Sequence, residues 1–340
     1  MSADMAADTS PSPDGAMGTL SGTRPMQTVS TDASGAAAPV IRATGLAKKY
    51  GSTEAVKDAS FEVRSGDVFG FLGPNGSGKS TTIAMLLGLI RPTRGQIDFF
   101  GMGPARREEA LTRVGAIIEI RAFYPYLSGR DNLRVMAHLR PGVTKKRIEE
   151  MLDIVGLSGA AKKPFGNYSL GMKQRLGIAS TLLHNPDLLI LNEPTNGLDP
   201  AGMVEVRHLL LRLAAEGKTI FISSHLLNEI EQVCDRVAII NKGTIIAEGA
   251  VDDLVQQSQA TLVRVDQPRQ AITILRELGG VQQVEECGDD LLVTAPGLPP
   301  AKINAVLVQA GLDVHELRRA ENSLERVFLE ITGTASEQAA

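Results

Sequence analysis

One short segment, Gly73–Thr81, constrains the fold more than any other part of the sequence. It reads Gly-Pro-Asn-Gly-Ser-Gly-Lys-Ser-Thr and matches the pattern G-x-x-x-x-G-K-[ST]. The apolar run Val68–Leu72 before it is typical of a buried strand, and the apolar spacing of Thr82–Ile90 after it predicts a helix. A strand, a glycine-rich loop and a helix in this order are the context that a phosphate-binding loop of this pattern requires. The segment therefore predicts an α/β fold that binds phosphate groups.

The residue types of this loop explain its chemistry. Glycines let the backbone bend so that successive N–H groups face one anion, and the helix N-terminus adds partial positive charge there. Lys79 is expected to reach the β- and γ-phosphates and to take part in catalysis, and the Ser80 hydroxyl is expected to bind Mg²⁺. The expected phosphate-binding residues are Gly73, Pro74, Asn75, Gly76, Ser77, Gly78, Lys79, Ser80 and Thr81. The bare pattern arises by chance in roughly one chain in a hundred, so a glycine-rich turn before an ordinary helix is the alternative.

Composition bounds the class of protein. The chain has 340 residues, of which 43% are hydrophobic, and this is enough for two domains with a sizeable core. A net charge of −4 provides no basic field for nucleic acid, so no nucleic-acid partner is expected. The cysteines, Cys234 and Cys287, match no metal or redox spacing and suit a reducing cytosol. The sequence shows no secretion signal and no apolar run of the roughly 18 residues that a membrane span needs, so the chain is not expected to cross a membrane itself.

The pattern along the chain predicts three parts. Residues 1–39 are rich in Ala, Ser, Thr, Gly, Pro and Asp and predict a disordered tail, with a docking segment as the alternative. Strands and helices alternate over residues 40–254, and a helical stretch at about 121–180 predicts a subdomain. A β-α-β-β-α-β order over 255–335 predicts a small α+β domain of the split βαβ type, with no catalytic constellation. The expected strands of the first domain are Val40–Thr44, Ser60–Val63, Val68–Leu72, Gln96–Phe100, Val114–Ile118, Asp187–Leu191, Thr219–Ser223, Arg236–Ile240 and Gly243–Glu248.

Polar residues follow two further predicted strands. Glu193 and His225 come directly after buried strands, and ligands of open α/β sheets bind beyond the carboxyl ends of strands. Glu193 is the candidate catalytic base or water-orienting residue, with a capping carboxylate as the alternative. His225 is the candidate catalytic sensor of the γ-phosphate, with an ordinary surface histidine as the alternative. Ser169 begins a helix, so its hydroxyl and the Gly171 N–H suit an anion, although an N-cap alone explains Ser169 equally well.

Together these motifs resemble those of the ATP-binding-cassette ATPases, from about Val40 to Leu254. Ser169–Gln174 resembles the family signature Leu-Ser-Gly-Gly-Gln, although Tyr168, Leu170 and Met172 differ from it. The remaining matches are Leu188–Glu193 with the Walker B strand and its catalytic Glu, Gly197–Asp199 with the D-loop, His225 with the switch histidine, and Tyr50 with the aromatic residue that stacks on adenine.

The resemblance implies a RecA-like α/β core with an antiparallel β subdomain and a helical subdomain. It also implies ATP and Mg²⁺ as cofactors. Two cassettes of the family pack head to tail, so that each ATP lies between one phosphate loop and the other chain's signature. Ser169, Gly171 and Asp199 are therefore expected to bind the nucleotide of a second cassette, most simply in a homodimer, although a different cassette partner is an alternative.

Two stretches resemble the bacitracin- and drug-resistance type of exporter subunit, namely Tyr168–Arg175 and Ala122–Leu133, and Ser323–Leu329 resembles the common ending of that type. Such subunits work with a separate membrane permease. The resemblance thus implies a cytoplasmic protein held at the inner face of the cell membrane, with Arg121–Leu139 as the permease contact. The substrate cannot be inferred, because the permease selects it.

Two positions depart from the family pattern. Asn192 stands where Walker B has the Asp that helps to hold Mg²⁺, and Glu119 stands where the family has its Q-loop Gln. Hard cations prefer carboxylate ligands. The expected metal residues are therefore Ser80, Glu119 and Asn192, with the hypothesis that Glu119 restores the missing charge. The alternative is a site weakened at both positions.

Three functions are compatible with these features. The first is an ATPase that powers export of drugs, antibiotics or peptides through a separate permease. The second is a nucleotide-gated dimerisation module with little hydrolysis, which Asn192 favours. The third is a cassette protein that acts on ribosomes or DNA, which usually carries two cassettes or a long coiled-coil insert, and neither is present in this sequence.

Overall fold

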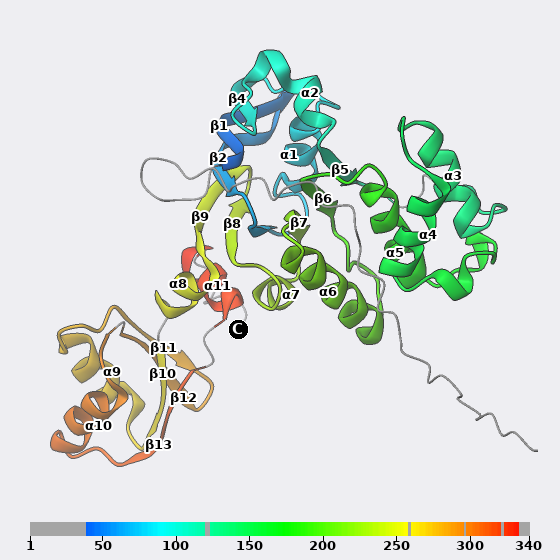
Figure 1. Cartoon of the computed structure of the whole chain (residues 1–340). Helices are drawn as coiled ribbons and strands as arrows, with labels where there is room; N and C mark the ends of the chain where they lie inside the picture. The colour runs from blue at the N-terminus through cyan, green and yellow to red at the C-terminus, as the bar shows by residue number, and fades with distance from the viewer. Residues whose placement is uncertain (1–38, 120–122, 258–259, 296, 321–322, 333–340) are drawn as a thin grey trace, which may run out of the picture.

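The computed structural model describes residues 39–119, 123–257, 260–295, 297–320 and 323–332. The predictions for residues 1–38, for Arg121 and Ala122, and for residues 333–335 lie outside this part. Within it the chain forms a large and a small β-sheet (Figure 1). The large sheet has the strand order β4-β1-β2-β9-β8-β3-β7-β6-β5, and the small sheet has the order β11-β12-β10-β13. The strands of the large sheet are β1 (Pro39–Tyr50), β2 (Thr53–Arg64), β3 (Val68–Leu72), β4 (Arg94–Phe99), β5 (Val114–Ile117), β6 (Leu188–Asn192), β7 (Thr219–Ser224), β8 (Arg236–Asn241) and β9 (Thr244–Ala250).

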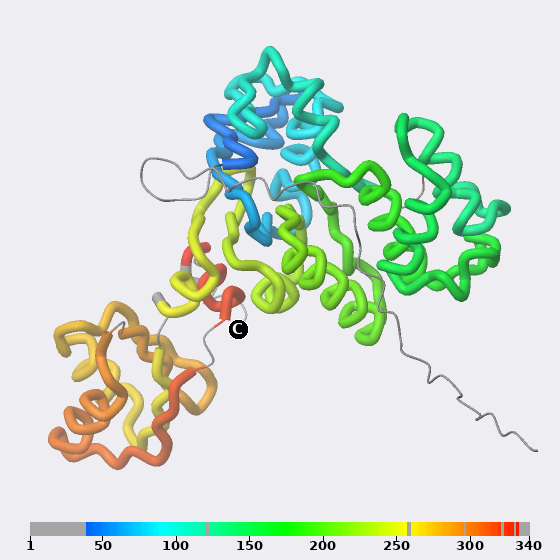
Figure 2. Tube along the Cα trace, viewed as in Figure 1, coloured from blue at the N-terminus to red at the C-terminus, as the bar shows by residue number. Residues whose placement is uncertain are grey.

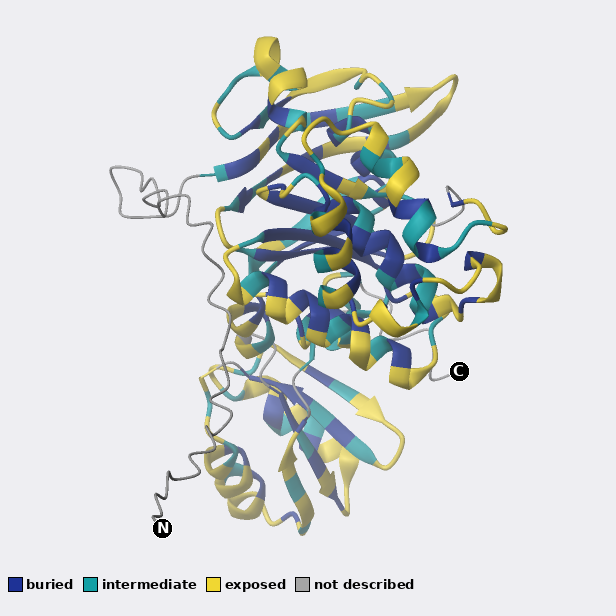
Figure 3. Ribbon diagram, turned by 45° about the vertical axis from the view of Figure 1, so that its right-hand side comes forward, coloured by how far each residue is buried: buried dark blue, intermediate teal, exposed yellow. Residues whose placement is uncertain are grey.

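The parallel centre of the large sheet is its most buried part. All residues of β3 and β7 are buried, and β3 pairs in parallel with both β7 and β8. Continuous apolar runs suit strands that are covered on both faces, and Figure 3 shows the dark core between the helices. β6 pairs in parallel with β7 and β5, so the carboxyl ends of these strands meet at one edge of the sheet. The polar segments that follow β3, β6 and β7 therefore lie along that edge.

The first two strands are longer than the sequence predicted. β1 and β2 form an antiparallel hairpin whose ends, Tyr50 and Thr53, are paired, whereas strands were expected only at Val40–Thr44 and Ser60–Val63. Several register shifts interrupt the pairing, and polar residues occupy the outer halves of both strands. The two-residue alternation that reveals a half-buried strand is therefore broken there. β4 completes this antiparallel layer by pairing with β1.

Helices cover both faces of the large sheet and form a separate group beside it. The helices are α1 (Lys79–Leu86), α2 (Arg107–Leu111), α3 (Gly129–His138), α4 (Lys145–Ile154), α5 (Leu170–Leu182), α6 (Pro200–Ala215), α7 (Leu227–Glu231) and α8 (Val251–Gln257), with single 3-10 turns at Pro104–Arg106, Ser158–Ala160 and Phe165–Asn167. α3, α4 and α5 contact one another to the side of the sheet (Figure 1). Ser128 and Thr144 cap α3 and α4, since each side-chain oxygen accepts a backbone N–H of the first turn.

The small sheet belongs to a separate α+β unit. Its strands and helices follow the order β10 (Ala260–Val265), α9 (Pro268–Glu277), β11 (Gln283–Cys287), β12 (Asp290–Thr294), α10 (Pro300–Gln309) and β13 (Val314–Arg319). All neighbouring strands pair antiparallel, and the two helices pack on the sheet around their own hydrophobic cluster. This is the split βαβ arrangement that the sequence predicted.

The last helix returns from this unit to the large domain. α11 (Leu324–Thr332) lies against α7 and α8 (Figure 2). Leu324 and Val327 are buried in the same hydrophobic cluster as Ile230 of α7, and the Leu324 N–H donates to Glu231 Oε2 at 3.1 Å. The chain therefore leaves the large domain after α8, builds the small unit, and returns to the large domain with α11.

In the part of the chain that the structure describes, no helix has both the length and the apolar character to span a membrane.

Candidate nucleotide-binding site

The phosphate loop joins β3 to α1 through glycines, two of which lie so close to backbone atoms that a side chain would clash. Gly78 precedes α1 with φ 112°, and no side chain caps the first turn of the helix. A Cβ atom on Gly73 would lie 2.2 Å from the carbonyl oxygen of Ile240, and one on Gly78 would lie 2.7 Å from that of Ala55. These positions need glycine because backbone atoms approach them closely. The loop therefore presents its N–H groups at a helix N-terminus that has no side-chain partner of its own.

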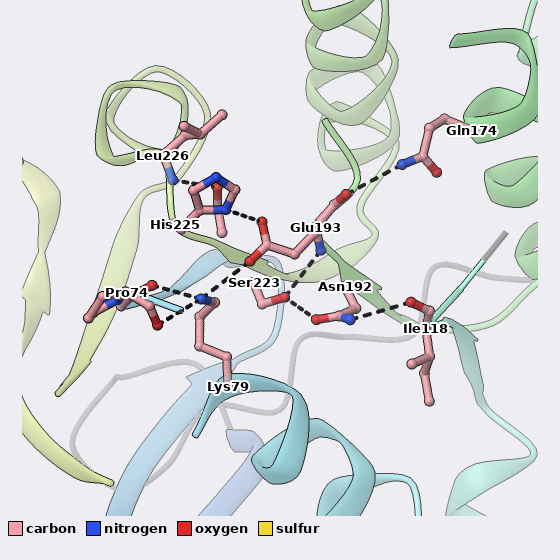
Figure 4. Close-up of polar contacts among 11 residues, drawn as sticks. Pro74, Lys79, Ile118, Gln174, Asn192, Glu193, Ser223, His225 and Leu226 are labelled. Atoms are coloured by element: carbon pink, nitrogen blue, oxygen red, sulfur yellow. Dashed lines mark hydrogen bonds and ion pairs between the residues drawn. The ribbon is translucent and has the colours of Figure 1, made fainter. Parts of the chain in front are cut away.

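Lys79 is fixed inside the loop that carries it. Its side chain is only 6% exposed and makes an ion pair with Glu193, with Nζ 3.3 Å from Oε1. The same Nζ donates to the carbonyl oxygens of Gly73 at 2.7 Å and Pro74 at 3.3 Å (Figure 4). A buried ammonium group is tolerated only when it is paired and hydrogen-bonded, and these contacts meet that need. These contacts therefore hold the positive charge of Lys79 at the start of the phosphate loop.

Glu193 points between Lys79 and His225 (Figure 4). His225 Nδ1 lies 2.8 Å from Glu193 Oε2, and a carboxylate only accepts, so Nδ1 donates this hydrogen bond. The Glu193 backbone has φ 50°, a left-handed conformation that is rare outside glycine. Gln174 Nε2 donates to the Glu193 carbonyl oxygen at 3.3 Å, which ties α5 to the end of β6. Glu193 therefore has a strained backbone, and its carboxylate is held in place by Lys79 and His225.

These side chains share a pocket of about 350 Å³. It is lined by Ala55, Asn75, Gly76, Gly78, Lys79, Ser80, Thr81, Glu193, Asn196 and His225. All but Ala55 and Asn196 were candidates from the sequence. Asn196 lies in a turn after β6, where its N–H donates to the Glu193 carbonyl oxygen at 3.2 Å. Asn196 could have been predicted to line the pocket, because it follows Glu193 closely at the same edge of the sheet. Nothing in the sequence indicated Ala55, because only the long β1–β2 hairpin brings this residue to the phosphate loop.

Several other candidates lie outside this pocket. Tyr50 is an exposed residue at the tip of the β1–β2 hairpin, where Lys48 Nζ lies 5.0 Å from the centre of its ring. Ser169 caps α5 by accepting the Met172 N–H at 3.2 Å, and Asp199 caps α6 by accepting the Gly202 N–H at 3.3 Å. Gly171 is buried beside Gly202, since a Cβ on it would lie 3.8 Å from the Gly202 Cα. The signature and D-loop candidates therefore lie at the N-termini of α5 and α6, away from the lining of the phosphate pocket.

The structure does not bring the expected metal residues together. Ser80 lines the pocket, but Glu119 is exposed and lines a second pocket beside Ile118 and Phe123. Asn192 lines neither pocket. Its Oδ1 accepts the Ser223 hydroxyl at 2.6 Å, and its Nδ2 donates to the Ile118 carbonyl oxygen at 3.3 Å.

The pocket suits a phosphorylated nucleotide. It combines the Lys79 ammonium, the Ser80 and Thr81 hydroxyls and uncapped N–H groups, which are the donors that phosphate oxygens require. The Ser77 hydroxyl is buried in the loop and has no hydrogen-bond partner among the described residues. For Mg²⁺ the pocket offers the Ser80 hydroxyl, whereas the one carboxylate that lines it among the described residues is Glu193.

Comparison with known proteins identifies the family. The profile described as ABC transporter matches residues 56–196. The bacitracin transport ATP-binding protein BcrA of Bacillus licheniformis is 44% identical over 298 residues, which cover 86% of this chain and 97% of that protein. The chain belongs to the ABC transporter ATP-binding proteins. It is thus a member of an ATPase family, and its cassette has the α/β core, antiparallel layer and helical group that the sequence predicted.

Two further relatives place this cassette within its family. The lantibiotic transport ATP-binding protein SrtF of Streptococcus pyogenes is 42% identical over 213 residues, which cover 63% of this chain and 92% of that protein. Among solved structures, cbiO1 of Clostridium perfringens, part of the ABC transporter complex cbiONQ, is 28% identical with a TM-score of 0.57, and the match covers 62% of this chain and 88% of that one. The solved cassette and this chain share the cassette fold.

Proposed function

We propose that this chain is the ATP-hydrolysing subunit of an exporter for drugs, antibiotics or peptides. The observation that carries the proposal is the Glu193 carboxylate, held by Lys79 and His225 at the wall of the phosphate pocket. The names of the relatives BcrA and SrtF support transport of antibiotic peptides. Phosphoryl transfer to water depends on positioning and on charge stabilisation, and both are available in this pocket.

Each side chain has a defined task in this proposal. Glu193 orients the attacking water and accepts its proton, and His225 holds the Glu193 carboxylate through Nδ1, so that its other ring nitrogen would be available to a γ-phosphate oxygen. Lys79 neutralises the phosphate oxygens once they replace the Glu193 carboxylate as its partner. The loop N–H groups and the hydroxyls of Ser80 and Thr81 bind the phosphates. Mg²⁺ would be held at Ser80 and would neutralise charge on the phosphates.

ATP hydrolysis by the purified chain, measured against Mg²⁺ concentration, tests this proposal. The native chain is expected to hydrolyse ATP only with Mg²⁺, and Glu193→Gln is expected to lose about 100-fold or more of the rate while it still binds ATP. Glu108→Gln, an exposed carboxylate on α2, is the matched control and should leave the rate unchanged. ATP binding without turnover, both alone and with the permease, would instead identify the nucleotide-gated module that Asn192 favours.

We also propose that Arg121–Leu139 contacts a membrane permease, which would hold the chain at the inner face of the cell membrane. In the described part of this range, Tyr126 is 74% exposed and Leu139 is 73% exposed. The neighbouring pocket of about 380 Å³ is lined largely by apolar side chains such as Leu89, Ile117 and Met136. Exposed apolar residues beside an apolar groove suit an interface.

Co-purification with membranes that contain the permease tests the contact. Leu139→Asp is expected to release the chain from the membranes without changing its affinity for ATP, because Leu139 is not among the residues that line the phosphate pocket. Leu211→Asp on α6, also an exposed leucine, is the control and should stay bound. Equal release of both variants would contradict the proposed contact.

A further inference from the structure

His225 is attached to a very short helix. A single residue, Leu226, separates it from α7, and the Leu226 N–H donates to the Ser224 hydroxyl at 2.9 Å (Figure 4). α7 has five residues, and an isolated helix shorter than roughly 12 residues is only marginally stable in water. Packing against other elements must therefore hold α7 in place. Because only Leu226 intervenes, a shift of α7 also moves the backbone of His225.

Two elements of the large domain hold the middle of α7. Ile230 packs so closely on β3 that a Cβ atom on Gly70 would lie 2.5 Å from the Ile230 Cγ2 atom. Glu229 makes an ion pair with Arg207 of α6, with Nη2 2.9 Å from Oε1, and both side chains are largely buried. These contacts fix the fourth and third residues of α7, but they leave its last residue to a different partner.

The partner at the end of α7 is α11. The carboxylate of Glu231, the last residue of α7, accepts the Leu324 N–H at 3.1 Å. Leu324 begins α11, so this carboxylate lies where the helix dipole favours negative charge. Leu324 and Val327 are buried in the hydrophobic cluster that includes Ile230. α11 therefore covers α7 with apolar side chains and holds its end through a hydrogen bond.

α11 is itself fixed by contacts with both parts of the chain. The Arg326 N–H donates to the Ser323 hydroxyl at 3.3 Å, which caps the first turn of the helix. The Arg326 side chain reaches the small unit, where Nη2 donates to Thr294 Oγ1 of β12 at 3.4 Å. On the large domain α11 also contacts α8. A helix with partners on two bodies has a defined position, so α11 is a firm support for α7.

We propose that α11 positions His225 for ATP hydrolysis, with Glu231 as the positioning residue that connects the two. The hydrogen bond from His225 to Glu193 is 2.8 Å long and directional, so a small displacement of α7 weakens it. Glu231 does not line the phosphate pocket, so it acts on hydrolysis through α7 and leaves ATP binding unchanged. The inference rests on the role of His225 in the proposed function.

Two measurements on the full chain test the inference. The first is the nuclear magnetic resonance signal of the His225 ring, assigned with His225→Gln. Glu231→Ala removes the acceptor of the Leu324 N–H and is expected to shift this signal, while the signal of His138 on α3 stays in place. The second is the steady-state rate of ATP hydrolysis. Glu231→Ala is expected to lower kcat about tenfold and to leave KM unchanged.

Two further variants separate the lost contact from general damage. Glu231→Gln keeps a side-chain oxygen that can accept the Leu324 N–H, so it is expected to retain most of the native kcat. Glu325→Ala removes an exposed carboxylate from the first turn of α11 and should change neither the His225 signal nor kcat.

An unchanged His225 signal in Glu231→Ala would overturn the inference, and so would an equal loss of kcat in Glu231→Ala and Glu325→Ala. In both cases the proposed function stands if His225→Gln lowers the rate of hydrolysis. A His225 signal that shifts while kcat keeps its native value would overturn the proposed role of His225, and the inference with it.

Discussion

At the scale of single residues, the pocket depends on backbone positions as much as on side chains. Gly73, Gly78 and Glu193 each occupy a conformation or a close approach that the surrounding strands impose. The sequence predicted the loop glycines because their spacing is a motif with a mechanism. It could not predict the left-handed conformation of Glu193 or the two-sided contact of Asn192, because both depend on strands that are distant in sequence.

Gly73→Ala tests whether the loop needs glycine at that position. The added Cβ would lie 2.2 Å from the Ile240 carbonyl oxygen, so the loop must shift, and overpacking of this kind costs about 1–3 kcal/mol. We expect a lower melting temperature and weaker ATP binding. Gly159→Ala is the matched control, because nothing lies within 4 Å of its new Cβ and its φ is ordinary. Equal behaviour of the two variants would show that the close approach does not matter.

The two thiols should differ in reactivity. Burial raises the pKa of the Cys234 thiol well above its usual range, and the nearby Asp235 carboxylate raises it further, so the reactive thiolate does not form near neutral pH. Cys287 is exposed at the end of β11. A thiol reagent at pH 8 is expected to label Cys287 alone in the folded chain and both cysteines in guanidinium. Labelling of a Cys287→Ser variant under native conditions would contradict the buried thiol.

At the scale of secondary-structure elements, the sequence predicted apolar strands better than bent ones. β3, β6 and β7 are continuous apolar runs, and the structure places them close to the expected bounds. β1 and β2 were predicted too short because bulges and polar residues interrupt their alternation. The apolar spacing of α11 indicates that one face of this helix is buried. It does not indicate whether that face packs against the large domain or the small unit.

Leu324→Ala tests how firmly α11 joins the large domain. Leu324 is 0% exposed in the hydrophobic cluster that includes Ile230, and truncation of a buried leucine costs about 2–5 kcal/mol. We expect the free energy of unfolding of the large domain, measured in urea, to fall by an amount in that range. Ile331→Ala in the same helix removes a side chain that is 45% exposed and should have a much smaller effect. A loss confined to the small unit would mean that α11 does not stabilise the large domain.

At the scale of the whole molecule, the residues expected to bind nucleotide fall into two groups that lie in different places. The phosphate loop, Glu193 and His225 share a pocket, whereas Ser169 and Asp199 begin α5 and α6 outside its lining. The sequence predicted both sets of residues from their motifs. Their separation depends on where α5 and α6 begin relative to the sheet, which only the assembled fold determines. The separation agrees with the head-to-tail homodimer that the family resemblance implies, in which each group would meet its complement on a second chain.

Mixing two inactive chains tests this composite site directly. Lys79→Ala removes the cation of the phosphate pocket, and Ser169→Arg places a bulky charge at the exposed start of α5. Each variant alone is expected to lack ATP hydrolysis, because both sites of its homodimer contain the defect. In a mixed dimer, one site collects both substitutions and the other pairs an intact Lys79 with an intact Ser169, so hydrolysis should return on mixing. If each site lay within a single chain, every site in the mixture would remain defective and no activity would return. A third chain with both substitutions is the control: mixed with either single variant it forms no intact site, so it should restore nothing.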